Sequence, residues 1–318
     1  MGVPGSGKSV LFTALTRAGV QGGRANQAVV QVPDPRLPVL AEMERSRKVV
    51  SAQIRFIDVP GGVSSAQGLA KLREVDALAL VVRCFGPDAK PAEELDRVRS
   101  ELLLDDLAVI EPALEKARKR GLGKPAPEVD ALDEAARTLD AGKPLREALS
   151  PVEAAELKGI APLTLKPEVV IANLEEGAAV PPELGPDAVG VYASIEAETA
   201  EMDPDEARAL LEEFGVDEPG LGKVIAACYR ALDLVTFLTT GEDETRAWHV
   251  RKGATAPEAA AAIHTDLQRG FIRAEVIPYE DLVAAGSMEK AKLAGKLRVE
   301  GRDYRVREGD VLHVRFAV

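Results

Sequence analysis

The chain has 318 residues, of which 46% are hydrophobic and 29% are charged, and its net charge is −12. This globular composition excludes a disordered or fibrous protein, and the length predicts about two or three domains. A negative overall field argues against a protein that coats nucleic acid or anionic membrane non-specifically. We therefore expect any contact with RNA to be local.

The sequence also limits the compartment and the chemistry. Two distant cysteines, Cys84 and Cys228, exclude a disulfide framework or a zinc ribbon and fit a reducing cytoplasm. The longest apolar run is too short to cross a bilayer and no secretory signal is visible, so we expect a cytoplasmic location and no membrane partner. The three histidines, His249, His264 and His313, lie in the last quarter of the chain, which excludes histidine-dependent catalysis in the first three quarters.

The first part of the chain, to about residue 87, alternates helical and extended patterns. Residues 9–17 have apolar positions on one helical face and predict a helix. Residues 53–59 and 77–85 are near-continuous apolar runs of strand length. Because such runs suit strands covered on both faces, they predict a parallel sheet flanked by helices.

Residues 91–159 change to a helical pattern. Apolar residues are spaced by three and four positions on both sides of a Gly/Pro-rich breaker at residues 121–127. This spacing predicts an antiparallel helical hairpin with a coiled-coil-like seam. The seam residues are Leu103, Leu107, Ile110, Leu114 and Ala117 in the first helix and Val129, Leu132, Ala136 and Leu139 in the second.

The α/β pattern resumes after this insertion. Residues 168–173 and 188–193 predict short strands, and residues 206–214 and 221–234 predict helices. The helical hairpin therefore splits one α/β domain in two.

The last part of the chain is rich in short strands, with one helix predicted at residues 257–267. The predicted strands are residues 235–240, 246–251, 274–279, 296–301, 303–308 and 310–318. A small mixed sheet wrapped on one helix is the expected packing. From residue 235 on there are 13 basic and 13 acidic residues, so the negative charge belongs to the preceding part.

These patterns give an α/β fold class with three parts. The predicted boundaries are 1–88 and 162–233 for the split sheet domain, 89–161 for the helical insertion, and 234–318 for the small C-terminal domain.

Residues 2–9, GVPGSGKS, match the pattern G-x-x-x-x-G-K-[ST] of phosphate-binding loops. The glycines let backbone N–H groups converge on phosphate oxygens, and the helix that comes next directs its positive end at the same anion. Lys8 would reach the β- and γ-phosphates, and the Ser9 hydroxyl would bind Mg²⁺. The alternative is a glycine-rich loop that merely starts a helix. The predicted nucleotide-binding residues here are Gly2, Pro4, Gly5, Ser6, Gly7, Lys8, Ser9 and Val10.

A second polar motif, D-x-x-G, overlaps the end of the apolar run at residues 53–59. Asp58 at the end of a buried strand is costly without a partner, and Mg²⁺ or its water shell is the expected one. The amide of Gly61 is where a γ-phosphate would be sensed. The alternative is an aspartate that starts a loop and binds no ligand.

A third polar segment, Asn173-Leu174-Glu175-Glu176, lies at the end of the apolar strand at residues 168–173. Guanine-specific proteins have N-K-x-D at this position, with the aspartate bound to guanine. Here Leu174 replaces the lysine and Glu176 replaces the aspartate, so guanine selectivity is not secured. We predict that Asn173, Leu174 and Glu176 border the base; a polar turn is the alternative.

Taken in order, these motifs resemble the YchF subfamily of Obg-related P-loop NTPases. The resemblance also rests on residues 73–85 (REVDALALVVRCF), on 196–202 (EAETAEM) and on most of the chain after Ala231. It implies a P-loop domain with a coiled-coil insertion and a C-terminal TGS domain, which is a ubiquitin-like β-grasp. It further implies Mg²⁺, a preference for ATP over GTP, slow hydrolysis and association with ribosomes.

The chain is divergent and shortened relative to that family pattern. No strand precedes Gly2 in the sequence, so either the start lies further upstream or the sheet is incomplete. The segment from residue 18 to residue 50 is shorter than in the family and contains no threonine. Lys71 occupies the position at which the family has a histidine proposed to assist hydrolysis. We expect phosphate binding to be preserved and hydrolysis to be slow, and we assign no catalytic residue.

Five cations cluster at the predicted tip of the helical hairpin: Lys116, Arg118, Lys119, Arg120 and Lys124. Cations at a helix C-terminus are favourable with the helix dipole, so a solvated helix end is one interpretation. In an acidic protein that approaches RNA, this tip and the C-terminal domain are the other candidates for a ribosome contact.

The function predicted from the sequence is thus a translation-linked ATP-binding P-loop NTPase with weak hydrolysis. One alternative is a ribosome-associated adaptor that acts without nucleotide through its C-terminal domain and hairpin. Another is a true GTPase. A P-loop kinase is disfavoured, because no acceptor lid or arginine-rich closing segment is evident.

Overall fold

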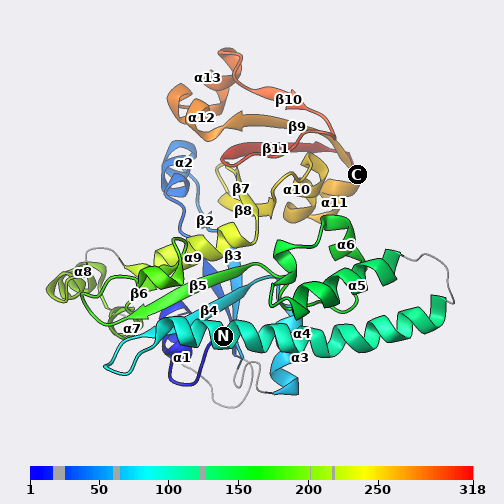
Figure 1. Cartoon of the computed structure of the whole chain (residues 1–318). Helices are drawn as coiled ribbons and strands as arrows, with labels where there is room; N and C mark the ends of the chain where they lie inside the picture. The colour runs from blue at the N-terminus through cyan, green and yellow to red at the C-terminus, as the bar shows by residue number, and fades with distance from the viewer. Residues whose placement is uncertain (17–25, 60–64, 122–126, 201, 217–218, 318) are drawn as a thin grey trace. The chain divides into compact units, whose positions relative to one another are not determined.

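A computed structural model describes the chain except at residues 17–25, 60–64, 122–126, 201, 217–218 and 318, so Gly61 and Lys124 lie outside the described residues (Figure 1). The chain forms two compact units. Unit 1 comprises residues 1–28 and 56–231, and unit 2 comprises residues 29–55 and 232–318. This division differs from the predicted boundaries, because residues 29–55 pack with the C-terminal segment.

The central sheet of unit 1 is parallel, with strand order β4-β5-β6. Its strands are β4 (Leu78–Cys84), β5 (Glu168–Leu174) and β6 (Val189–Val191). A separate two-stranded sheet joins β1 (Asn26–Gln31) to β3 (Gln53–Asp58) and crosses the boundary between the units along the chain. The predicted apolar strands are confirmed, and their continuous apolar sequences agree with the near-complete burial of β5.

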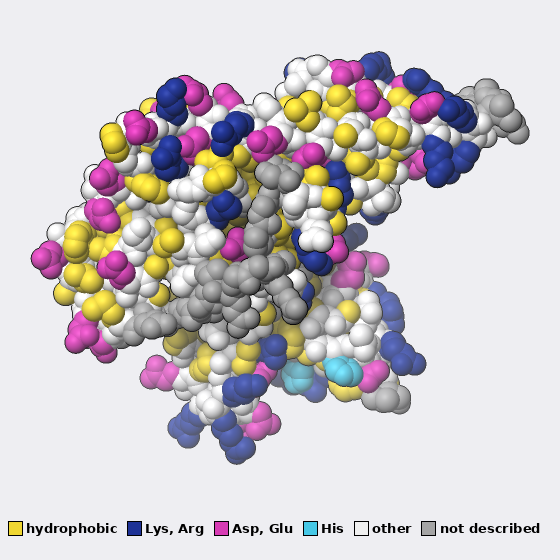
Figure 2. Space-filling view, turned by 90° about the horizontal axis from the view of Figure 1, so that it is seen from below, with side chains coloured by type: hydrophobic (Ala, Val, Ile, Leu, Met, Phe, Trp, Pro, Cys, Tyr) yellow, Lys and Arg dark blue, Asp and Glu magenta, His cyan; other side chains and the backbone are white. Residues whose placement is uncertain are grey.

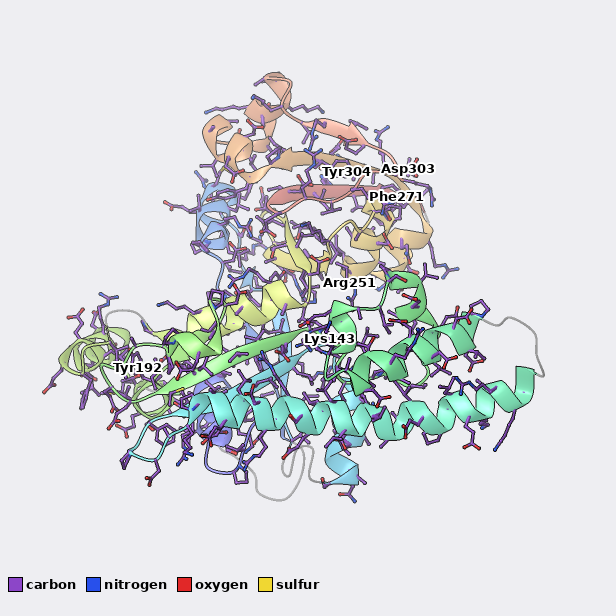
Figure 3. The ribbon with its side chains drawn as sticks, in the orientation of Figure 1. Lys143, Tyr192, Arg251, Phe271, Asp303 and Tyr304 are labelled. Carbon is purple, nitrogen blue, oxygen red and sulfur yellow. The ribbon has the colours of Figure 1, made fainter. Side chains whose placement is uncertain are left out.

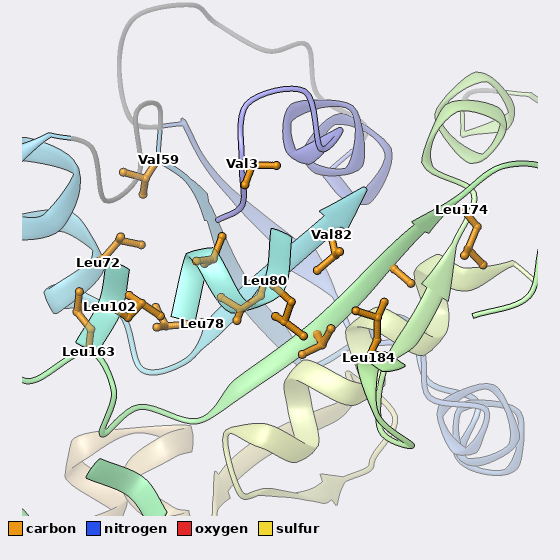
Figure 4. Packing of buried hydrophobic residues seen from close by; sticks show 14 residues of the cluster. Val3, Val59, Leu72, Leu78, Leu80, Val82, Leu102, Leu163, Leu174 and Leu184 are labelled. Atoms are coloured by element: carbon orange, nitrogen blue, oxygen red, sulfur yellow. The ribbon is translucent and has the colours of Figure 1, made fainter. Parts of the chain in front are cut away.

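Residues 1–3 run alongside β4. The Met1 backbone nitrogen donates to the Ala79 carbonyl, and the Val81 N–H donates to the Met1 carbonyl at 2.7 Å, which is the pattern of a parallel bridge. Val3 is 8% exposed and packs in one cluster with Val59 of the segment after β3 (Figure 4). The chain therefore enters the glycine-rich loop from the sheet.

Unit 1 also contains helices outside the helical insertion. They are α1 (Lys8–Thr16), α3 (Ala66–Glu74), α7 (Ala193–Thr199), α8 (Pro204–Glu213) and α9 (Gly220–Ala231), with a 3₁₀ turn at Pro182–Leu184. Ser65 caps α3 by accepting from the Gly68 N–H at 3.0 Å. The predicted helices after the glycine-rich loop and near the end of the unit are confirmed.

The helical insertion is confirmed as a hairpin. It consists of α4 (Pro91–Gly121) and α5 (Pro127–Asp140), followed by a 3₁₀ turn at Leu145–Glu147 and by α6 (Pro151–Glu156). All nine predicted seam residues belong to one apolar cluster, in which Ile110 and Leu132 are almost fully buried. The three-and-four spacing thus placed the seam correctly.

The base of the hairpin is held by a buried carboxylate. Asp106 of α4 is 0% exposed and accepts from the Thr164 N–H at 2.7 Å, the Thr164 hydroxyl at 2.8 Å and the Leu163 N–H at 2.8 Å. The Arg73 guanidinium of α3 donates to the same carboxylate at 3.1 Å and to the Ala161 carbonyl at 3.1 Å. Because a buried charge is tolerated only when it is paired and hydrogen-bonded, this network fixes α3 and α4 together.

Unit 2 is a six-stranded mixed sheet of order β10-β9-β11-β7-β8-β2. The strands are β2 (Val49–Val50), β7 (Leu234–Thr239), β8 (Thr245–Arg251), β9 (Phe271–Pro278), β10 (Arg298–Glu300) and β11 (Asp310–Phe316). Its helices are α2 (Arg36–Glu44), α10 (Ala256–Ile263), α11 (Thr265–Arg269), α12 (Tyr279–Ala285) and α13 (Met288–Leu293). The predicted β-grasp class, a mixed sheet wrapped on a helix, is confirmed.

Two apolar clusters stabilise unit 2. One joins Phe237 and Val276 of the sheet to Ala259 and Ala260 of α10. The other includes Leu37 and Leu40 of α2, which pack with Leu238, Ala247, Ile277, Leu282 and Val311. The segment between the glycine-rich loop and Asp58 therefore supplies part of the core of the C-terminal unit.

Two local predictions for unit 2 were wrong. Residues 303–308 do not form a strand; they contain a single bridge, Thr255 to Arg305, because the Asp310 carboxylate accepts from the Arg307 N–H and closes a turn. The predicted helix at 257–267 is two helices, since the backbone of His264 is extended and its side chain caps α11. Helices α12 and α13 were not predicted. Among the described residues, no helix is long and apolar enough to span a membrane.

Candidate functional site

The glycine-rich loop has the conformation that its glycines allow. Gly5 and Gly7 adopt φ of 81° and 86°, a region that favours glycine, and the Ser6 N–H donates to the Val3 carbonyl at 3.2 Å. A Cβ on Gly7 would lie 2.1 Å from Asn173 Nδ2, and one on Gly2 would lie 2.2 Å from the Val81 carbonyl. Both glycines are therefore required by close approach.

The solvent-facing part of the loop is the part that a phosphate would reach. Pro4, Gly5, Ser9 and Val10 are exposed, whereas Ser6 is buried. Helix α1 begins at Lys8, so its first backbone N–H groups and the positive end of its dipole lie at the loop.

Lys8 folds back over the loop. Its Nζ donates to the Val3 carbonyl at 3.1 Å, and the side chain is half-buried. Burial lowers the pKa of Lys8, and the Asp58 carboxylate opposes this shift in part. A partly desolvated ammonium interacts more strongly with an anion than one in water.

Ser9 and Asp58 come together as the two motifs predict. The Ser9 hydroxyl donates to Asp58 Oδ2 at 3.1 Å, although the residues are 49 positions apart. A hydroxyl and a carboxylate side by side are hard oxygen donors of the type that Mg²⁺ prefers, and a bound nucleotide supplies further oxygens. The pair fits an Mg²⁺ ion. The described residues contain no cluster of three or more His, Cys, Asp or Glu that could hold a metal by itself.

Asn173 connects the end of β5 to the loop. It is 4% exposed, its Nδ2 donates to the Ser6 carbonyl at 3.0 Å, and its Oδ1 accepts from the Ala193 N–H at 3.2 Å. The side chain thus uses both its donor and its acceptor to hold the glycine-rich loop against the segment before α7. These two partners distinguish the amide nitrogen of the side chain from its oxygen.

The other two predicted base residues lie in different surroundings. Leu174 is 7% exposed, and its side chain packs in the core. It fills the space beside Gly190, where a Cβ would lie 2.8 Å from Leu174 Cδ1. Glu176 is exposed in the turn after β5. Of the three residues predicted to border the base, only Asn173 and Glu176 thus place polar side-chain groups near the carboxyl end of β5.

Glu196 is a buried carboxylate beside the site that the sequence did not single out. It is 2% exposed and accepts from the backbone N–H groups of Tyr192 at 3.0 Å, Gly220 at 2.9 Å and Leu221 at 2.8 Å. It therefore joins α7 to the N-terminus of α9, where a negative charge is favourable. The available signals were a glutamate a few residues after a short strand, which is too common to identify alone, and its place at the start of residues 196–202, which assigns it no role.

The basic tip of the hairpin is largely neutralised by nearby acids. Arg118 pairs with Asp133, Lys119 with Glu115 and Arg120 with Glu128. Lys116 is exposed, and Figure 2 shows blue side chains interleaved with magenta ones at this end of the molecule. The arrangement supports a solvated helix end rather than a strongly cationic surface.

Comparisons with known proteins agree over the full chain. A family model named YchF-GTPase_C, described as a protein of unknown function, matches residues 234–317. The "Ribosome-binding ATPase YchF" of Pasteurella multocida is 41% identical, with 100% of this chain and 98% of that protein covered. The proteins of the same name from Escherichia coli O157:H7 and Bacillus subtilis are 38% and 37% identical, with the same coverage.

Solved structures give the same result. The Schizosaccharomyces pombe YchF GTPase matches with a TM-score of 0.87 and 26% identity over 99% of this chain and 96% of that one. A GTP binding protein from Pyrococcus horikoshii matches with a TM-score of 0.64 and 19% identity over 100% of this chain and 98% of that one, which supports the fold alone.

Proposed function

This chain belongs to the YchF family, and from that premise we propose that it is a ribosome-associated P-loop NTPase that binds ATP with Mg²⁺ and hydrolyses it slowly. The observation that carries the proposal is the contact between Ser9 and Asp58 at 3.1 Å, because it brings the two nucleotide motifs to one place. A glycine-rich loop that only starts a helix does not require a contact between its serine and this aspartate.

Phosphate binding follows from the loop and from α1. The N–H groups at the start of α1 and the Lys8 ammonium lie beside the exposed residues Gly5 and Ser9. A triphosphate would replace the Val3 carbonyl as the partner of Lys8 Nζ. Charge-assisted hydrogen bonds of this kind are about twice as strong as neutral ones.

Ser9 and Asp58 would hold the Mg²⁺ ion. When bound, the ion neutralises charge on the phosphates and orients them. The residues of this chain would bind and orient the nucleotide, since phosphoryl transfer depends chiefly on positioning and electrostatics.

Slow hydrolysis is proposed from the environment of Lys71 in α3. This lysine, at the position of the family's proposed catalytic histidine, donates to Glu74 at 2.8 Å and is 41% exposed. An exposed, paired ammonium with no acceptor function is a poor group for orienting or deprotonating a water.

The preference for ATP over GTP is proposed from Asn173 and Glu176. Asn173 is committed to the Ser6 carbonyl and the Ala193 N–H, and Glu176 replaces the aspartate that would select guanine. GTP binding tighter than ATP binding would contradict this assignment and favour the GTPase alternative.

Isothermal titration calorimetry with ATP and GTP in the presence of Mg²⁺ tests the site directly. We expect ATP to bind, and Lys8→Ala to weaken binding by roughly tenfold or more, since a hydrogen bond to a charged group contributes about 1.5–3 kcal/mol. Lys8→Arg, which keeps the charge, is the matched control. Absence of ATP and GTP binding below millimolar concentration would overturn the proposal.

Association with ribosomes is proposed from the names of the relatives. Co-sedimentation with purified ribosomes, with and without ATP, is the test. Sedimentation that responds to ATP in the wild type but not in Lys8→Ala supports an NTPase. Sedimentation indifferent to nucleotide in both proteins would instead favour the adaptor.

A further inference from the structure

Two segments of unit 1 meet at the carboxyl end of β5. One is the loop from Asn173 to Ala178, and the other is the pair Tyr192 and Ala193 at the start of α7. The Tyr192 hydroxyl donates to the Ala178 carbonyl at 3.0 Å, and the Ala193 N–H donates to Asn173 Oδ1 at 3.2 Å. Figure 3 labels Tyr192, the residue before α7. The loop is therefore fastened to the second segment at both of its ends.

The loop between these two bonds is a tight turn. The Ala178 N–H donates to the Glu175 carbonyl at 3.0 Å, and Gly177 has a φ of 75°, which a glycine adopts without strain. Glu176 lies within the turn and is exposed. Its position thus depends on how firmly the two ends of the turn are held.

Tyr192 is well placed to hold the far end. Its backbone N–H donates to the buried carboxylate of Glu196 at 3.0 Å, and its ring packs against the core cluster that contains Leu174. Because the ring is restrained by packing and the backbone by a charged acceptor, the hydroxyl can hold Ala178 with little further loss of side-chain freedom.

We propose that Tyr192 is a positioning residue for the nucleotide base. Its hydroxyl orders the Asn173–Ala178 loop before the nucleotide arrives, so that Glu176 is presented to the base without an ordering cost at binding. This inference rests on the proposed function. It predicts a contribution to recognition of the base and none to recognition of the phosphates, which the glycine-rich loop and Lys8 bind.

The experiment compares two ligands on one variant. Tyr192→Phe removes the hydroxyl and keeps the ring. We expect its dissociation constant for Mg²⁺-ATP to rise roughly three- to tenfold, as the loss of one neutral hydrogen bond predicts, and its affinity for tripolyphosphate, which has no base, to stay within about twofold of wild type.

Tyr304→Phe is the matched control. It removes a tyrosine hydroxyl that donates to Asp310 at 2.7 Å in unit 2, and it should leave both affinities unchanged. Hydrogen exchange supplies a second readout: peptides that cover residues 173–178 should exchange faster in Tyr192→Phe, and peptides that cover the glycine-rich loop should not.

The outcomes separate the inference from the proposed function. If the wild type binds neither ATP nor tripolyphosphate, the proposed function falls and the inference falls with it. If the wild type binds both and Tyr192→Phe binds ATP equally well, the inference alone is overturned. An equal loss of both ligands also overturns it, because that would mean a general structural role for Tyr192.

Discussion

The two compact units carry very different shares of the charge. Unit 1 has 22 basic and 35 acidic residues, a net charge of −13, whereas unit 2 has 18 basic and 17 acidic residues, a net charge of +1. The candidate phosphate site lies in the strongly acidic unit. Because the overall field of unit 1 repels an anion, phosphate affinity has to come from short-range donors, namely the N–H groups of the loop and Lys8.

The units also differ in how they use buried carboxylates. In unit 1, Asp106 bonds to Thr164, 58 residues away, and Glu196 bonds to Gly220, 24 residues away. In unit 2, Asp310 accepts from Arg307 and Tyr304, three and six residues away. Single carboxylates in unit 1 therefore join distant segments, and unit 1 should be the more sensitive to their loss.

The largest effect is expected from Asp106→Ala. It removes the charge partner of the Arg73 guanidinium and the acceptor of the backbone N–H groups of Leu163 and Thr164, so unit 1 should lose about 3–5 kcal/mol of stability. Chemical denaturation followed by circular dichroism measures the change. Asp133→Ala, which breaks an exposed pair with Arg118, is the control and should cost at most about 1 kcal/mol. Equal costs for the two variants would contradict the comparison.

Glu196→Gln should have a smaller effect. The amide keeps one acceptor oxygen but cannot serve the N–H groups of Tyr192, Gly220 and Leu221 as the two carboxylate oxygens do. We expect a loss of about 1–3 kcal/mol in unit 1, measured by the same denaturation. A variant as stable as wild type would show that the charge at the start of α9 contributes nothing.

The pH dependence of binding tests whether phosphate affinity comes from a short-range donor, Lys8. Burial lowers the pKa of Lys8 below its ordinary value of 10.5, so its positive charge is lost as the pH rises through that lowered value. Tripolyphosphate affinity should therefore fall about twofold by the pH that equals this pKa, as half of the ammonium is lost. Lys8→Arg stays charged throughout and should show no such fall. A flat profile in the wild type would contradict the role of Lys8.

The smallest effect is expected at the tip of the hairpin. Arg118, Lys119 and Arg120 are exposed and paired, so replacing all three by glutamine should change stability by no more than about 1 kcal/mol and leave ribosome co-sedimentation unchanged. A strong, salt-dependent loss of sedimentation would instead assign an RNA contact to the tip.

Much of the fold could be predicted because its signals are local. Continuous apolar runs predicted β3, β4 and β5, and the three-and-four spacing predicted the seam of the hairpin. The membership of residues 29–55 in unit 2 could not be predicted, since the partners of Leu37 and Leu40 lie about two hundred residues away and no periodicity encodes that pairing. Residues 303–308 alternate like a strand, but a turn closed by Asp310 leaves them with one bridge.

The part of the candidate site that belongs to sequence motifs with fixed spacing could be predicted. The two motifs predicted that Ser9 and Asp58 meet, and the structure brings them to 3.1 Å. The side chain of Leu174 packs in the core, which motif position alone could not tell, and its role at the base stays a prediction. Glu196 and Tyr192 went unassigned, since their roles depend on backbone groups that only folding brings to them. The roles of Gly61 and Lys124 stay predictions.

The placement of residues 29–55 has a consequence for biosynthesis. Leu37 and Leu40 leave the ribosome early, but the strands that bury them, β7, β9 and β11, are made much later. Until β11 is synthesised, the apolar face of α2 lacks part of its packing partners, and a nascent chain halted before residue 232 lacks all three of these strands. The core that residues 29–55 share with the C-terminal segment can therefore be completed only after β11 has been synthesised.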